Sequence, residues 1–244
     1  MPSKLRLDKT ILNLNKVMHR ALQPDIQRAL LDEVQRHVHF NETDDMLTKA
    51  LFLARWLRST YLTWLPEVPI CKNCGQPMEA GLYKKDKASI VMFKPNPKDW
   101  RGYDEVPADN MCDKVERSAC NACGIVELHS RERDVLLIMK LRVGRCGEFN
   151  NLFVSFCLAL GWKVRSIAAI LDGDDHVWSE LYQGGKWIPI DVSAEDPERL
   201  IKDQFLFQKW NWKLEHVYAL EAGKLPVLID TYRKVQVPEP ASTN

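Results

Sequence analysis

Apolar residues recur at helical spacing through the first part of the chain. The stretch 11–38, ILNLNKVMHRALQPDIQRALLDEVQRHV, shows this period, and Pro24 should end or kink its first helix. The stretch 41–65, NETDDMLTKALFLARWLRSTYLTWL, repeats the period, with Asn41 or Thr43 as the expected N-cap before acidic residues. The pattern therefore predicts helices along this whole region.

The later part of the chain changes from a helical period to short strands. The run 131–142, RERDVLLIMKLR, is typical of a short helix, and the run that begins at GRCGEF (144–149) is typical of a longer one. Five further stretches are rich in branched and aromatic residues, as strands are. They are 163–170, 176–182, 186–191, 216–222 and 225–232. Helices followed by an antiparallel sheet predict the α+β class.

The composition narrows the class of protein. The 244 residues are 45% hydrophobic and 27% charged, with a formal net charge of +1, so bulk charge gives no support for nucleic-acid binding. No segment reaches the roughly 18 uncharged apolar residues of a membrane span, and the first residues do not resemble a secretory signal. We therefore expect a protein of a reducing compartment, the cytosol or the nucleus, with no membrane span and no nucleic-acid partner.

Four of the seven cysteines form two CxxCG motifs, CKNCG at 71–75 and CNACG at 120–124. Such a turn points both sulfurs at one centre, and four thiolates would complete a closed tetrahedral site for structural Zn²⁺. Unrelated buried cysteines and a redox CxxC are the alternatives, and the duplicated motif disfavours both. The predicted metal ligands are Cys71, Cys74, Cys120 and Cys123, without Cys112. The proline-rich stretch 94–110 between the motifs is predicted to be a loop.

A further cysteine, Cys146, stands where a helix should start, in the sequence GRCGEF. Apolar residues follow it at helical offsets and form one stripe, and Gly161 provides a C-terminal stop. The stripe consists of Phe149, Leu152, Phe153, Phe156, Cys157 and Leu160. Packing is one explanation of Cys146, but the unpaired amides and the dipole of a helix start favour a reactive thiolate there. Cys157 lies on the buried stripe and is expected to be inert.

A thiolate nucleophile needs a base and a group that orients the base, and His176 and Asp191 are the candidates. In regular strands, His176 projects to one face of 176–182, and Asp191 ends the strand 186–191. If these strands pair as a hairpin through the turn YQGGK, the two side chains come close together. The sequence then predicts a Cys-His-Asp triad with its nucleophile on a helix and its partners on adjacent strands.

Each partner of Cys146 also has a simpler interpretation. A histidine at the start of a strand often only satisfies a local hydrogen bond, and an aspartate that closes a strand is usually a turn former. The remaining histidines offer no better base, because they lie in the helical region or lack a nearby polar constellation. They are His19, His37, His39, His129 and His216. From the residues alone, the triad and the simpler interpretation stay open.

Taken together, these motifs resemble the transglutaminase-like core of the cytosolic peptide:N-glycanases. The resemblance is carried by GRCGEF, DDHVWSELY, WIPID, the two CxxC motifs, TYLTWLPEVPIC and the distal WNWKLEHVYALEAGKLPVLIDTYRKV. These stretches occur in one consistent order over roughly residues 50 to 235. The resemblance implies a papain-like transglutaminase core, a helix plus an antiparallel sheet, with N-terminal helices and a four-cysteine zinc subdomain.

The resemblance also implies roles for single residues. Cys146 would attack the amide that links an N-glycan to asparagine, His176 would act as general base and acid, and Asp191 would hold the imidazole. Trp64, Trp178, Glu180 and Trp187 would line the sugar side of the cleft. Trp178 and Glu180 share the face of His176 in a regular strand, although core packing explains Trp178 equally well.

Two positions depart from the pattern of this family. Phe149 stands where tryptophan is usual, and Ala194 stands where an acidic residue is usual, with Glu195 one position later. The second departure bears on one of the sugar contacts. In length, the chain resembles the minimal, fungal-type members, whose N-terminal helices bind a ubiquitin-receptor shuttle protein.

We therefore predict an amidase that releases N-glycans from misfolded glycoproteins in the cytoplasm, and also in the nucleus. Its expected partners are these glycoproteins and, through the N-terminal helices, a ubiquitin-receptor shuttle protein or the proteasome. The alternatives are a transglutaminase-like cysteine protease with the same triad, and a catalytically silent scaffold like the transglutaminase-like DNA-damage recognition proteins. The predicted regions are N-terminal helices 1–66, a zinc-binding subdomain 67–128, a catalytic core 129–235 and a tail 236–244.

Overall fold

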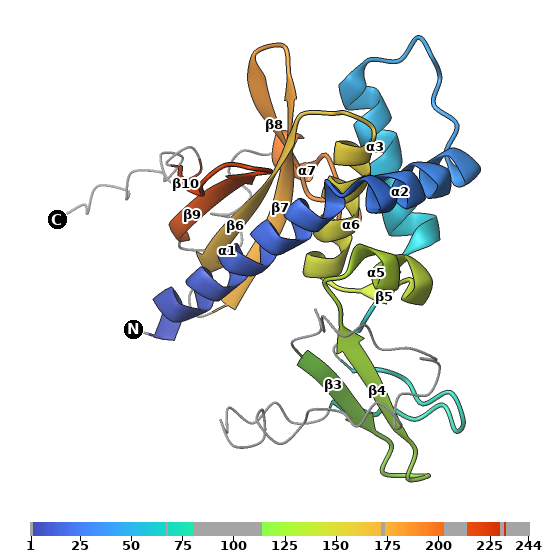
Figure 1. Ribbon diagram of the computed structural model, residues 1–244. Coiled ribbons are helices and arrows are strands. Elements are labelled where there is room, and N and C mark those ends of the chain that lie inside the picture. The colour runs from blue at the N-terminus through green and yellow to red at the C-terminus, as the bar shows by residue number, and fades with distance from the viewer. Residues whose placement is uncertain are drawn as a thin grey trace, which may run out of the picture.

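The computed structural model of the protein combines helices with two antiparallel sheets and a short parallel strand pair (Figure 1). The structure describes residues 2–66, 68–80, 114–171, 174–202, 214–229 and 232. The predicted loop 94–110, Cys112 and the tail 236–244 lie outside these ranges. Within them, the arrangement of elements confirms the predicted α+β class. None of the helices in these ranges is long and apolar enough to cross a membrane.

Two N-terminal helices, α1 (Pro2–Ala21) and α2 (Pro24–His37), meet at a proline, as the sequence predicts. Pro24 stands in the first turn of α2, where its missing N–H would have no partner within the helix. Both helices pack on helix α6 (Cys146–Ala159). Their buried residues belong to the main core and include Leu14, Val17, Leu30 and Val34.

The next helix, α3 (Met46–Trp56), begins later than predicted. Its N-cap is Asp45, whose carboxylate accepts a hydrogen bond from the backbone N–H of Thr48 at 2.7 Å. The prediction of Asn41 or Thr43 as the cap is wrong. The Asn41 side chain instead accepts hydrogen bonds from the backbone N–H and the hydroxyl of Thr43, at 3.3 and 3.0 Å, in a turn that precedes the helix.

The segment ahead of α6 consists of short elements that pair with one another. A π-helical turn, η1 (Leu57–Tyr61), extends α3 and leads into strand β1 (Thr63–Trp64). Strand β1 pairs in parallel with β5 (Val143–Gly144), which follows helix α5 (Val135–Leu141). The backbone N–H of Leu65 donates to the carbonyl of the last β5 residue at 2.8 Å. These contacts hold the chain directly before α6.

The main sheet has five antiparallel strands in the order β10-β9-β6-β7-β8. They are β6 (Val164–Leu171), β7 (Asp174–Gln183), β8 (Lys186–Ile190), β9 (Leu214–Glu221) and β10 (Val227–Leu228). Strands β7 and β8 form the predicted hairpin, and Gly184 and Gly185 make its turn with φ of 59° and 80°, a left-handed backbone that favours glycine. A short helix, α7 (Arg199–Lys202), lies against β8.

Helix α6 is buried around its circumference rather than along one stripe. The apolar residues of the predicted stripe are buried or half-buried, but so are the polar residues Asn150, Asn151 and Ser155 between them. The reason is that α1, α2 and α5 contact α6 together with strands β6 and β7. The Asn150 side chain donates to Ser166 at 3.1 Å and accepts from Ser179 at 2.6 Å, so it ties the helix to the sheet.

The predicted metal-binding region forms a hairpin that projects away from the main sheet (Figure 1). Strands β3 (Lys114–Ala119) and β4 (Val126–Arg131) make this hairpin, and the short strand β2 (Glu79–Ala80) pairs with β3. Strand β4 runs through the boundary predicted between residues 128 and 129. The metal-binding hairpin therefore ends at Arg131, and β4 points toward α5 in Figure 1.

Candidate active site

Cys146 occupies the first position of helix α6. The preceding residue, Arg145, is the N-cap in an extended conformation, and its backbone N–H donates to the Glu148 carboxylate at 2.9 Å. Cys146 is half-buried, whereas Cys157 further along the helix is fully buried. Burial raises the pKa of the Cys157 thiol well above its usual value, and a neutral thiol of this kind is unreactive. The accessible thiol of α6 is thus the one at the helix start.

His176, on strand β7, lies between Cys146 and Asp191. Its Nε2 atom is 3.1 Å from Oδ2 of Asp191. The imidazole also hydrogen bonds the side chain of Cys146. Because Nε2 faces Asp191, Nδ1 is the ring nitrogen that is left for the sulfur. The structure therefore brings together the three residues of the candidate triad, from the start of α6, from β7 and from the residue that follows β8.

Burial and charge act in opposite directions on this cluster. Burial alone would lower the pKa of His176, but the hydrogen bonds to Asp191 and Cys146 and the charges of both raise this pKa to about 10. Burial alone would raise the pKa of Asp191, but the hydrogen bond and charge of His176 hold it below its usual range. At neutral pH the cluster thus holds a protonated imidazole between the sulfur and an ionised carboxylate.

Further hydrogen bonds fix the carboxylate of Asp191, which is completely buried. Its Oδ1 accepts from the backbone N–H and the hydroxyl of Ser193, at 3.2 and 2.7 Å. Its Oδ2 accepts from Nη2 of Arg199 at 2.9 Å as well as pairing with His176. No sequence signal identifies Arg199, because its contact arises only when α7 folds back against β8.

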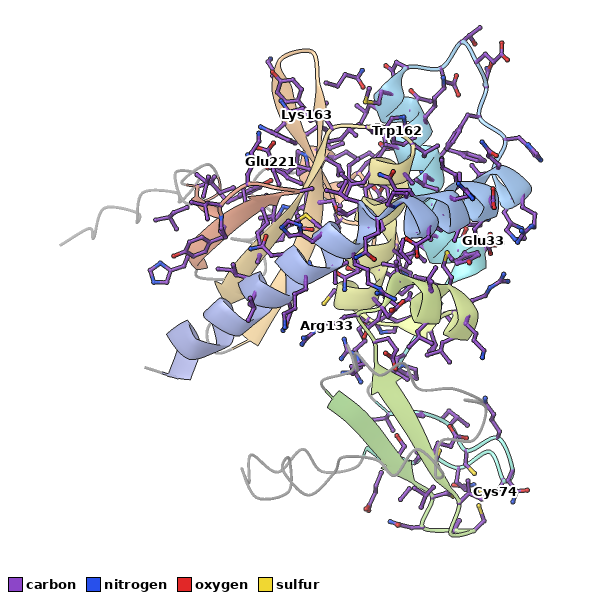
Figure 2. All side chains as sticks on the ribbon, viewed as in Figure 1. Glu33, Cys74, Arg133, Trp162, Lys163 and Glu221 are labelled. Atoms are coloured by element: carbon purple, nitrogen blue, oxygen red, sulfur yellow. The ribbon has the colours of Figure 1, made fainter. Side chains whose placement is uncertain are left out.

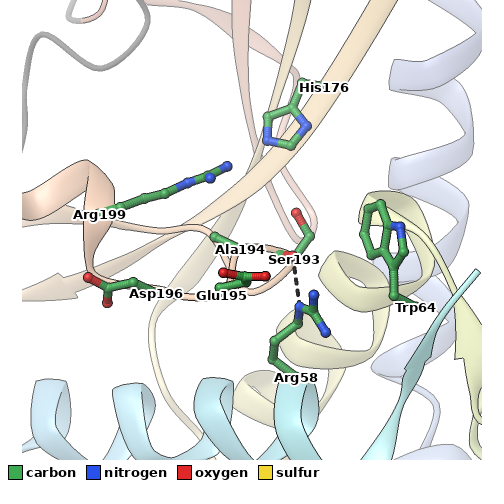
Figure 3. Close-up of a pocket in the computed structure, with 8 residues that line it drawn as sticks. All are labelled: Arg58, Trp64, His176, Ser193, Ala194, Glu195, Asp196 and Arg199. Atoms are coloured by element: carbon green, nitrogen blue, oxygen red, sulfur yellow. Dashed lines mark hydrogen bonds between the residues drawn. The ribbon is translucent and has the colours of Figure 1, made fainter. Parts of the chain in front are cut away.

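The triad histidine opens on a cleft of about 520 Å³ (Figure 3). The residues that line this cleft are Arg58, Trp64, His176, Ser193, Ala194, Glu195, Asp196 and Arg199. Trp64, one of the predicted sugar-side residues, is therefore in the wall. Ala194 and Glu195, the positions that depart from the pattern of the glycanases, are there as well. The volume lies within the range of about 300–1,000 Å³ that ligand pockets occupy.

Arg58 is a cleft residue that the sequence analysis did not identify. It belongs to the π-helical turn η1, and its Nε donates to the carbonyl of Ser193 at 3.1 Å, the bond dashed in Figure 3. Its guanidinium carbon lies 5.7 Å from the ring centroid of Trp64 and 5.8 Å from that of Phe149. Phe149 is fully buried beneath this wall. Turns of the π type often occur at functional sites, but the sequence pattern does not distinguish them from an α-helix.

The other predicted sugar-side residues lie along strands β7 and β8, outside the lining of the cleft. Trp178 is completely buried and stacks against His176, with ring centroids 5.9 Å apart. Glu180 is also buried and forms an ion pair with Arg165. The guanidinium carbon of Arg165 lies 4.1 Å from the ring centroid of Trp187. The structure thus groups Glu180 with Trp187 through Arg165, and it packs Trp178 in the interior.

The four predicted metal ligands meet at the tip of the metal-binding hairpin, where Figure 2 labels Cys74. The sulfur atoms of Cys71, Cys74, Cys120 and Cys123 all lie within 4.8 Å of one another. Two of the sulfur–sulfur distances are 3.5 and 3.4 Å. Gly75 and Gly124 follow the motifs with φ of 72° and 71°, and their N–H groups close the two turns through hydrogen bonds of 2.8 Å. Such a cluster can hold a metal ion.

Known proteins match the chain in sequence over the region of this site. Residues 105–192 match the family described as the transglutaminase-like superfamily, and this range contains Cys146, His176 and Asp191. The chain is 34% identical over 201 residues to a peptide-N(4)-(N-acetyl-beta-glucosaminyl)asparagine amidase of Oryza sativa subsp. japonica, covering 80% of this chain and 39% of that protein. It is 27% identical over 225 residues to the protein of the same name from Gallus gallus, covering 91% and 30%. The corresponding protein of Saccharomyces cerevisiae is 26% identical over 182 residues, covering 74% and 44%.

The chain spans less than half the length of these curated relatives. A solved structure from Cytophaga hutchinsonii, described as a candidate cysteine protease, aligns with 72% of this chain and 44% of its own at 16% identity, with a TM-score of 0.36. That score is too low to support a structural argument. The family match over residues 105–192 and the curated relatives make the chain similar to transglutaminase-like proteins and, among them, to the peptide:N-glycanases.

Proposed function

We propose that the protein is an amidase that hydrolyses the amide bond between an N-glycan and asparagine, with Cys146 as the nucleophile. The observation that carries this proposal is the cluster of Cys146, His176 and Asp191 beside a cleft. A thiol at a helix start, an imidazole and an orienting carboxylate are the groups that a cysteine nucleophile needs for acyl transfer. The relatives named as amidases indicate which bond such a triad would cleave.

In the first half of the reaction, the Cys146 thiolate attacks the carbonyl carbon of the glycosylated side-chain amide. His176 is protonated before the attack and gives its proton to the departing glycosylamine nitrogen as the carbon–nitrogen bond breaks. The carbonyl carbon is then bonded to sulfur as a thioester. The backbone N–H of Cys146 lies at a helix start and is a candidate donor to the negatively charged oxygen of the intermediate.

In the second half of the reaction, His176 is neutral and acts as a base. It takes a proton from water while the water oxygen attacks the thioester carbon, and the carbon–sulfur bond then breaks. The asparagine has become aspartate, and the thiolate is restored beside a protonated imidazole. Asp191 transfers no proton in either half. Its bonds to Ser193 and Arg199 keep it ionised and so hold the imidazole in place.

We assign the sugar side of the substrate to aromatic residues near the cleft. Trp64 lies half-buried in the wall, and the face of an indole ring suits stacking on a sugar ring. Glu180 and Trp187, which Arg165 groups together, are candidates for contact with a more distant part of the glycan. Trp178 is fully buried against His176, and this packing supports a structural role for its ring.

We also propose that the four-cysteine cluster holds Zn²⁺. Bonds of about 2.3 Å in a tetrahedron place sulfur atoms about 3.8 Å apart. Two of the sulfur pairs lie 3.4 and 3.5 Å apart and all four sulfurs lie within 4.8 Å of one another, so shifts of about 1 Å or less would give this geometry. Cys71, Cys74, Cys120 and Cys123 would be the ligands. Zinc would cross-link the two CxxC turns there, which is a structural contribution, because four thiolates leave no ligand position for a substrate.

Other expectations stay predictions, because no described contact tests them. They include misfolded N-glycoproteins as the natural substrates and a cytoplasmic and nuclear location. They also include a ubiquitin-receptor shuttle protein or the proteasome as the partner of the N-terminal helices. The predicted limits of the four regions of the chain also stay predictions.

One comparison tests the amidase function against its alternatives. The protein is incubated with a denatured glycoprotein that carries high-mannose N-glycans and with an unglycosylated protein, and the products are analysed by mass spectrometry. We expect glycan release from the first and no cleavage of the second. Cys146→Ala, with its folding checked by circular dichroism, should release nothing. Cleavage of peptide bonds in both proteins would favour the cysteine protease, and an inactive wild type would favour the silent scaffold.

A further inference from the structure

A charged pair joins the metal-binding hairpin to the helix that carries Cys146. Arg131 is the last residue of β4, and Glu148 lies in the first turn of α6. Nε of Arg131 donates to Oε1 of Glu148 at 2.8 Å, and Nη2 donates to Oε2 at 2.9 Å. The two side chains are only 18% and 4% exposed. A planar guanidinium that binds both carboxylate oxygens fixes distance and orientation together.

Glu148 uses the same carboxylate to hold the chain just ahead of Cys146. Its Oε2 accepts from the backbone N–H of Arg145 at 2.9 Å. Its side chain also packs so closely on Gly144 that a Cβ at that glycine would lie 2.4 Å from the Glu148 Cβ. On the other side of Cys146, a Cβ at Gly147 would lie 3.9 Å from the guanidinium of the pair. The residue before the thiol, Arg145, therefore contacts this charged pair directly, and Gly147 after it lies beside the guanidinium.

The other end of strand β4 lies at the four-cysteine cluster. Cys123 closes the second CxxC turn, and β4 begins shortly after it and pairs with β3 in continuous antiparallel register up to Arg131. Figure 2 shows Cys74 at the tip of the metal-binding hairpin and Arg133, just beyond β4, at its junction with α5. A single regular strand thus spans the distance between the metal ligands and the charged pair.

We propose that Arg131 is a positioning residue through which the metal-binding hairpin holds the start of α6, and with it the Cys146 thiol, in its reacting geometry. Arg131 acts on the thiol through Glu148. The inference rests on the proposed role of Cys146 as a nucleophile, but it does not depend on the identity of the substrate. The hairpin contributes no residue to the described lining of the cleft. Through Arg131 it would nevertheless affect the chemistry.

Removal of the guanidinium would leave the Glu148 carboxylate buried beside the backbone N–H of Arg145 but without its charged partner. A buried carboxylate that loses its cation turns toward water or takes up a proton, because an unpaired buried charge is unfavourable. Either change releases the N–H of Arg145 and the backbone that orients Cys146. A lysine at position 131 would keep the charge but not the two-pronged contact, so it should restore the geometry only in part.

The test measures the rate at which iodoacetamide alkylates Cys146 as a function of pH, with the modified residue identified by peptide mass spectrometry. In zinc-loaded protein, we expect Arg131→Met to slow this alkylation by about tenfold near neutral pH and to change its pH profile. Arg131→Lys should recover part of the rate. Arg20→Met is the matched control, because Arg20 binds another buried carboxylate at a helix start, that of Asp134, the N-cap of α5, at 2.7 Å. It should lower the melting temperature without changing the pH profile.

An unchanged rate and pH profile in Arg131→Met, with a loss of thermal stability like that of Arg20→Met, would overturn the proposal. If Arg131→Met does not fold, Arg131→Lys and Glu148→Gln decide the question, and a rate equal to wild type in both would overturn it. The proposed function fails separately. A Cys146 that reacts quickly while no glycan is released contradicts the amidase alone, whereas a thiol that is inert in wild type contradicts both proposals.

A chelator tests the link between the metal-binding hairpin and the thiol. Removal of zinc from the wild type should slow alkylation of Cys146. In Arg131→Met, removal of zinc should slow the alkylation of Cys146 much less. Loss of the metal and loss of the guanidinium act along one route, so their effects are not additive. Equal chelator effects in the two proteins, or none in the wild type, would contradict the proposed route.

Discussion

The region around α6 and the metal-binding hairpin are stabilised in different ways. Around α6, large side chains such as Phe149, Phe153 and Phe156 are completely buried between helices and sheet. In the described part of the hairpin, the buried cluster consists of Cys71, Met78 and Cys120. Burial of apolar area therefore stabilises the first region, whereas the second buries little apolar area and would depend on the metal that we propose its cysteines bind.

The proposed reaction needs a buried, fixed triad and a correctly oriented start of α6, and the two regions supply these separately. The triad lies beside the well-packed region, and burial there shields Asp191 completely and His176 in large part. The metal-binding hairpin lies outside the described lining of the cleft and meets the start of α6 through Arg131. If the cluster holds zinc as proposed, a small unit that depends on a metal would adjust a site whose position is set by a large apolar core.

Of the changes predicted here, removal of the metal should have the largest effect on the stability of the metal-binding hairpin relative to that of α6. Zinc bound by a structural site contributes about 10–16 kcal/mol in small peptides, more than a cluster of three buried side chains can supply. We expect a chelator to abolish the protection of backbone amides in 114–131 against hydrogen exchange, while the amides of α6 keep most of their protection. Hydrogen exchange with mass spectrometry reports both regions at once. Equal losses in both would mean that they unfold as one unit.

A cavity in the apolar core should affect the other region. Phe153→Ala should lower the free energy of unfolding by about 3–5 kcal/mol, because its ring is completely buried. Phe52→Ala is the control, since Phe52 is 48% exposed and its truncation should cost less than about 1 kcal/mol. Urea unfolding followed by tryptophan fluorescence gives both values. Similar losses for the two substitutions would contradict the view that burial around α6 stabilises this region.

Replacement of a glycine by alanine should destabilise the two regions for different reasons. In Gly144→Ala, the new Cβ would lie 2.4 Å from the Glu148 Cβ, and we expect a loss of about 1–3 kcal/mol together with slower alkylation of Cys146. In Gly124→Ala, no atom lies within 4 Å, so only the left-handed backbone at φ of 71° opposes the change, at about 1–2 kcal/mol. Its Cys146 should react as in the wild type. Equal alkylation rates in both variants would exclude the predicted contact with Glu148.

The two regions should also lose stability at opposite ends of the pH scale. Folding raises the pKa of His176 from 6.5 to about 10, so its contribution is complete below pH 6.5 and is lost as the pH rises toward 10. In this window the unfolding free energy of the wild type, relative to His176→Gln, should fall by at most about 1.4 kcal/mol per pH unit. The metal-binding hairpin should fail as the pH falls, because protonated thiols release the metal. Urea titrations at several pH values measure the first effect, and a constant difference would exclude the charged imidazole.

Local sequence patterns were sufficient to predict the elements that carry the site. The start of α6 follows from the glycines and the apolar run around Cys146, and the pairing of β7 with β8 follows from the two glycines of their turn. The four-cysteine cluster follows from two copies of one motif. Each of these features depends on residues that are close neighbours in the sequence or on a repeated spacing.

The partners of these residues could not be predicted in the same way. Arg58, Arg131 and Arg199 look like ordinary surface cations in the sequence, because a long side chain gives no local sign of the group that it will meet. The N-cap of α3 was missed for a related reason. The stretch NETDD offers several capping side chains, and the choice of Asp45 depends on where α3 packs.

The fate of the glycosylated asparagine tests the central claim most directly. A denatured glycoprotein with a high-mannose N-glycan is incubated with the protein in water enriched in heavy oxygen, and its peptides and free glycans are analysed by mass spectrometry. The account predicts aspartate that carries one heavy oxygen at the former glycosylation site, together with a released glycan that keeps its innermost sugar, and neither product with Cys146→Ala. An asparagine that retains its amide or its first sugar would show that another bond is cleaved and would contradict the account.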